Sequence, residues 1–173
     1  MQRSAINGLL PGLLLATCAA SNSVRAETAH IYFSGTIAAP TCSLQTSNIT
    51  IPIGTVDRSV FTGVGSVSPY SPNVALISAG CNATLVSMTF SGTADADNPK
   101  LFAVTGGAKG VGIELAKTGG GAYAVPNDTS KPITFTPAAA GQGYSFAARY
   151  VQTTTTVTPG AGDATITVLI TYT

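Results

Sequence analysis

Residues 160–173, GAGDATITVLITYT, carry the clearest periodic pattern of the chain. From residue 164 onward apolar side chains occupy every second position, and threonine fills most positions between them. Successive residues of a β-strand point to opposite faces, so this pattern predicts a strand that presses one face onto a core. The apolar row consists of Ala164, Ile166, Val168, Ile170 and Tyr172, and only Leu169 breaks the polarity of the other row.

The edge of this strand needs a partner, because unpaired backbone groups at an edge attract another strand. The sequence ends on the strand, so we expect the partner to come from earlier in the chain or from another molecule. Residues 27–41 repeat the alternation and form a second such segment. Alternation alone leaves open whether that segment pairs within its own chain.

Composition favours an all-β protein of one domain. The chain has 173 residues, of which 45% are hydrophobic and 9% charged, so the charged residues that cover helix surfaces are scarce. Short strands separated by turn residues predict a β-sandwich. We expect these strands at residues 49–53, briefly near residue 60, at 73–90 as one strand or a pair, and at 111–115, 133–135 and 144–150.

The first 26 residues are typical of a signal peptide. Arg3 precedes an apolar run, and a small-residue cleavage site ends at Ala26, with cleavage after Ala20 as the alternative. Lipoprotein processing at Cys18 is a further alternative. Cleavage after Ala26 leaves six basic and seven acidic residues. This near-neutral balance lacks the excess of positive charge that binding to nucleic acid requires, so we expect no nucleic-acid partner.

Two cysteines remain if Cys18 is removed with the signal peptide. Disulfides persist in exported proteins, so we expect one between Cys42 and Cys81, with two free buried thiols as the alternative. A metal site would need further ligands. His30 is the single histidine, which leaves no basis for a catalytic triad, so we expect neither an enzyme nor a cofactor.

Several motifs of the chain occur together in one known family. They are IYFSGTI at residues 31–37, two cysteines about forty residues apart, GVGIEL at 110–115, FAARY at 146–150, Gly160 as the fourteenth residue from the end and the penultimate Tyr172. On these motifs the mature chain resembles the fimbrial subunits, or type 1 pilins, of the bacterial chaperone–usher pathway. The pair formed by Gly160 and Tyr172 is the most specific part of the resemblance.

The resemblance implies an immunoglobulin-like β-sandwich that lacks its seventh strand and is completed by a donor strand. A periplasmic chaperone would first lend a strand to the final strand and hold the Thr173 carboxylate. At an outer-membrane usher, the extension of the next subunit would replace the chaperone. The implied chaperone-binding and acceptor residues are Gly160, Ala164, Ile166, Val168, Ile170, Tyr172 and Thr173.

The same resemblance divides the chain into a signal peptide (1–26), a donor extension that runs into the first strand (27–41) and a pilin domain (42–173). The expected function is a structural subunit of a surface fimbria that supports cell adhesion and binds other fimbrial subunits. A minor adaptor or terminator subunit and a monomeric secreted glycan-binding sandwich are the alternatives. The implied donor residues are Ala29, Ile31, Phe33, Gly35 and Ile37.

Overall fold

The computed structural model describes residue 34 and residues 41–173. Contacts divide the chain into two units, residues 1–37 and residues 38–173, and the second unit contains every strand described. The predicted signal peptide and the five predicted donor residues lie outside the described residues. The second unit is all-β, as the composition predicted, and its strands form two antiparallel sheets.

The larger sheet has six strands in the order β1-β2-β8-β5-β4, with β6 also paired to β5. β8 lies at its centre because its first half pairs with β2 and its second half with β5. The strands are β1 (Cys42–Leu44), β2 (Val74–Cys81), β4 (Phe102–Ala103), β5 (Val111–Lys117), β6 (Tyr123–Ala124) and β8 (Gly143–Gln152).

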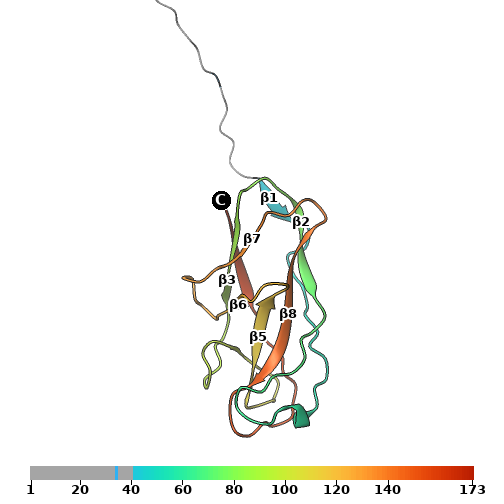
Figure 1. Ribbon diagram of the computed structural model, residues 1–173, viewed down its shortest axis with the longest axis vertical. Helices are drawn as coiled ribbons and strands as arrows, with labels where there is room; N and C mark the ends of the chain where they lie inside the picture. The colour runs from blue at the N-terminus through green and yellow to red at the C-terminus, as the bar shows by residue number, and fades with distance from the viewer. Residues whose placement is uncertain (1–33, 35–40) are drawn as a thin grey trace, which may run out of the picture. The chain divides into compact units, whose positions relative to one another are not determined.

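The smaller sheet has three strands in the order β7-β3-β9. These are β7 (Ile133–Phe135), β3 (Val86–Ser91) and β9 (Thr167–Tyr172). Figure 1 shows β9 beside β3, ending at the C-terminus. β3 is therefore the central strand, and β9 is an edge strand of its sheet.

One apolar core joins the two sheets. Val86, Met88 and Phe90 alternate along β3 and are 0–3% exposed, as their spacing predicted. The Phe90 ring meets the ring of Phe146 on β8 edge to face, with centroids 5.6 Å apart. Burying each large side chain stabilises the fold by about 1.5–3 kcal/mol. This core therefore fixes which face of β3 and β8 points inward.

Two sequence predictions in residues 49–60 are wrong. No strand forms at residues 49–53, where Pro52 lacks a donor and no other described segment pairs with the backbone. Arg58–Val60 is a 3-10 turn, because the Asp57 side chain accepts a hydrogen bond from the Ser59 N–H. Among the residues described, no helix is long and apolar enough to span a membrane.

Candidate strand-binding edge

Among the described strands, β9 pairs with β3 alone. Its residues pair with β3 from Thr167 opposite Ser91 to Tyr172 opposite Val86. Within residues 41–173 no segment pairs with its other edge. A strand with such an edge presents a row of N–H and C=O groups to which another strand can add.

The side chains of β9 and of the three residues before it alternate between covered and exposed positions. The five apolar residues of the predicted row are half-buried and pack against the core, whereas Leu169 on the opposite face is 65% exposed. The register places Val168 opposite Phe90 and Ile170 opposite Met88. Those β3 residues are buried, whereas their partners on β9 are half-buried at the edge of the sheet as residues 41–173 form it.

Ile49, Ile51 and Ile53 form a second half-buried apolar row. These side chains pack against the same core, and the residues between them are exposed. Residues 47–56 form no backbone hydrogen bond to the rest of the described chain. Two half-buried apolar rows therefore pack against one core, and only the row on β9 was predicted from the sequence as part of the site.

Tyr172 is the last residue of the apolar row on β9. Burial of its phenol raises its pKa, and Tyr144 nearby adds a smaller electrostatic contribution in the same direction. The neutral side chain therefore persists at physiological pH. The strand presents an apolar row without a charge along its whole length.

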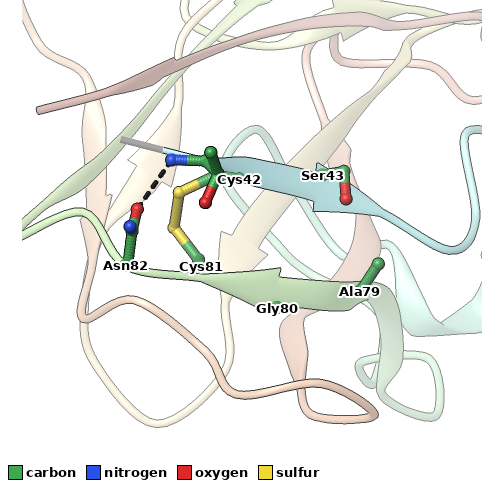
Figure 2. Close-up of a pocket in the computed structure, with 7 residues that line it drawn as sticks. Cys42, Ser43, Ala79, Gly80, Cys81 and Asn82 are labelled. Atoms are coloured by element: carbon green, nitrogen blue, oxygen red, sulfur yellow. Dashed lines mark hydrogen bonds between the residues drawn. A yellow bond between two sulfur atoms is a disulfide. The ribbon is translucent and has the colours of Figure 1, made fainter. Parts of the chain in front are cut away.

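The predicted disulfide Cys42–Cys81 is present and joins β1 to β2. Figure 2 shows it in a hollow at the start of the described domain, beside the hydrogen bond from the Thr41 N–H to the Asn82 Oδ1. Thr173 lies beside the residues that follow Asn82, because one oxygen of its carboxylate accepts hydrogen bonds from the N–H groups of Thr84 and Leu85. The start of this domain and the end of β9 are therefore both bound by residues 82–85.

Gly160 lies before β9 and outside its apolar row. A Cβ atom at this position would collide with the backbone of Gly107 and Ala108. The Ala108 N–H donates to the carbonyl oxygen of Ala161 at 3.0 Å, which holds the two loops together. This contact gives the glycine a role within the chain that its predicted place in the chaperone-binding set did not include.

A polar cluster on the larger sheet was not predicted. The Tyr70 hydroxyl and the Arg149 Nε both donate to Glu114 Oε1 at 2.7 Å, and the guanidinium lies over the Tyr70 ring. Although Tyr70 is 41% exposed, partial desolvation and then the hydrogen bond to Glu114 raise the pKa of its phenol above the usual value. Glu114 and Arg149 are cross-strand partners, a register that the sequence does not reveal. No cluster in the described part of the chain has the composition of a metal site.

Comparison with known proteins assigns the family. The family model "Fimbrial protein" matches residues 31–173. The chain is 32% identical to protein LpfE of Salmonella typhimurium, over 96% of this chain and 98% of that protein. It is 33% identical to the type-1 fimbrial protein subunit of Serratia marcescens, over 95% and 97% respectively.

The structure is also similar to a subunit in the solved structure of a chaperone–usher pilus. The TM-score is 0.63 at 20% identity, and the match covers 87% of this chain and 99% of that one. At this identity the likeness is one of fold, and it confirms the immunoglobulin-like sandwich that the sequence predicted. The chain therefore belongs to the fimbrial protein family, as a structural fimbrial subunit.

Proposed function

We propose that the subunit polymerises by donor-strand exchange, in which a strand from another molecule adds to the open edge of β9. The observation that carries the proposal is the half-buried apolar row from Ala164 to Tyr172 beside an edge that no segment of residues 41–173 pairs. Main-chain hydrogen bonds to the edge would supply affinity, and the alternate side chains would supply specificity. The family is one of structural proteins rather than enzymes, in agreement with this role.

The proposed donor is the extension at residues 27–39 of a second subunit. Its Ala29, Ile31, Phe33, Gly35 and Ile37 share one face, and covering each of the larger ones would contribute about 1.5–3 kcal/mol before ordering costs. This face would complete the core between β9 and the row of Ile49 to Ile53. Residues 42–173 would then be the pilin domain.

The point at which the extension joins the domain favours pairing with β9 of a neighbouring subunit over pairing with β9 of the same chain. Thr41 and Thr173 both bind the segment that follows β2, so the extension joins the domain at the C-terminal end of β9. Folded back along β9, the extension of the same chain would run parallel to it. A neighbour's extension can run antiparallel, which is the pairing of every strand in both sheets. Head-to-tail contacts of this kind generate open filaments.

The subunit would reach the cell surface through the periplasm. Residues 1–26 would direct export and be removed. A periplasmic chaperone would cover β9 until an outer-membrane usher exchanges it for the next subunit. The product would be a surface fimbria that contains other fimbrial subunits and supports adhesion.

Deletion of residues 27–37 tests the proposal. The shortened subunit should still bind the chaperone through β9, but it should fail to fill the edge of a neighbour. Electron microscopy of cells should then show few or no fibres. A matched pair refines the test: Phe33→Asp should block assembly, whereas His30→Asp, on the other face of the extension, should be tolerated. Fibres of normal length after the deletion would refute the donor assignment.

A further inference from the structure

Residues 82–85, the junction segment, bind both ends of the pilin domain. At one end, the Asn82 Oδ1 accepts a hydrogen bond of 2.6 Å from the Thr41 N–H. At the other end, the N–H of Thr84 and the N–H of Leu85 donate to one oxygen of the Thr173 carboxylate at 2.6 and 3.0 Å. The Thr84 hydroxyl donates to the same oxygen at 2.8 Å.

A covalent bond reinforces the first of these contacts. Cys42 follows Thr41 and is disulfide-bonded to Cys81, the residue before the junction segment. The Thr173 N–H also donates to the Leu85 carbonyl oxygen at 3.0 Å, which extends the ladder between β3 and β9 by one residue pair. Few bonds therefore separate the start of the domain from the end of β9.

We propose that the junction segment is a mechanical clasp that transmits load between Thr41 and β9. This inference rests on the proposed function. In a fibre, tension would reach the subunit through its own extension at Thr41 and through the strand bound along β9. The disulfide and the hydrogen bonds of residues 82–85 form the short route between these two points.

The position of the clasp fits exchange of the partner strand. Thr84 and Leu85 bind Thr173 from the side of β3, whereas the partner strand adds to the opposite edge of β9. The clasp can therefore stay closed while one partner replaces another. Thr84 is a positioning residue in this arrangement, since its hydroxyl acts on the partner only through β9.

Hydrogen exchange tests whether the clasp holds the strand. Thr84→Val keeps the side-chain shape and removes the hydroxyl donor. Thr89→Val on β3 is the matched control, because no side-chain hydrogen bond of Thr89 is present in the described structure and its partner Leu169 lies on the exposed face. We expect amide exchange at Leu85 and Thr173 to be roughly fivefold faster in Thr84→Val only, the effect of losing one hydrogen bond. Equal exchange in both variants would overturn the clasp.

Fibre pulling tests whether the clasp carries load. Under constant force, fibres of Thr84→Val should have a lifetime roughly fivefold shorter than fibres of wild type or Thr89→Val. Faster exchange with an unchanged lifetime would overturn load transmission and leave the proposed function intact. Failure of the wild-type chain to form fibres would overturn both load transmission and the proposed function. The hydrogen-exchange experiment would still show whether Thr84 holds the end of β9 in the single subunit.

Discussion

Val168 on β9 lies directly opposite Phe90 on β3, yet Phe90 is 3% exposed and Val168 is only half-buried. Both side chains belong to the same face of the smaller sheet. Phe90 packs against the Phe146 ring, and its carbonyl oxygen accepts a hydrogen bond from the Asn127 N–H on the side away from β9, whereas within residues 41–173 no segment pairs with the other side of β9. Val168 therefore marks where the core of the subunit is incomplete.

Substitution at Val168 should distinguish the two faces of β9. Val168→Asp places a charge on the core side and should lower subunit yield in the periplasm, with a loss of stability of about 3 kcal/mol or more. Leu169→Asp, at a side chain that is 65% exposed, should change stability by less than about 0.5 kcal/mol. Thermal unfolding of the two variants measures the contrast, and equal behaviour would contradict the assigned faces.

Loss of the disulfide should weaken the subunit. The bond joins Cys42 and Cys81 across 39 positions, a loop for which chain entropy predicts about 4 kcal/mol. The double variant Cys42→Ser/Cys81→Ser should unfold at lower denaturant concentration than wild type. Wild type in reductant should approach the variant, and an unchanged unfolding midpoint in both would contradict this contribution.

Gly160→Ala should destabilise the subunit before any partner binds. The new methyl group would collide with the backbone of Gly107 and Ala108, and overpacking of this kind costs about 1–3 kcal/mol. Gly120→Ala is the control, because a Cβ atom there meets nothing within 4 Å. Chemical denaturation of the purified variants measures the difference. A Gly160→Ala variant as stable as the control would point to partner binding as the reason for this glycine.

The stability of the subunit should fall in alkaline solution, and Tyr70 should contribute to the fall. Its pKa is raised in the folded state, so its contribution is fully present below the unfolded pKa of about 10 and is lost as pH rises above that value. The raised pKa values of Tyr150 and Tyr172 act in the same direction. Tyr70→Phe should therefore show a smaller loss of stability between pH 8 and pH 11 in urea unfolding, and an identical loss would contradict the role of Tyr70.

The sequence predicted the features that depend on one strand at a time. Alternation placed Val86, Met88 and Phe90 on one face, and it placed the apolar row of β9 on the core side. It extended β9 back to Ala164, although the paired strand begins at Thr167, because side-chain alternation continues where backbone pairing does not. Residues 49–53 likewise alternate in burial, although their backbone does not pair as a strand.

Features that depend on register or on close backbone contact could not be predicted. The cluster of Tyr70, Glu114 and Arg149 joins three distant parts of the chain through the pairing of β5 and β8. The contact of Gly160 with Gly107 depends on the meeting of two loops. The clasp at Thr84 depends on where the end of β9 lies relative to β3. In each case the residues carry no local pattern that marks the partner.

Cross-linking between two distinguishable copies tests whether the extension of one subunit binds β9 of another. Subunits labelled with heavy and light isotopes, each carrying a photo-crosslinker in place of Phe33, would be assembled together and analysed by mass spectrometry. If donor-strand exchange joins the subunits, cross-links form from residue 33 of one copy to residues 164–172 of another, including heavy-to-light pairs. Cross-links confined to single copies, with no heavy-to-light pairs, would contradict donor-strand exchange.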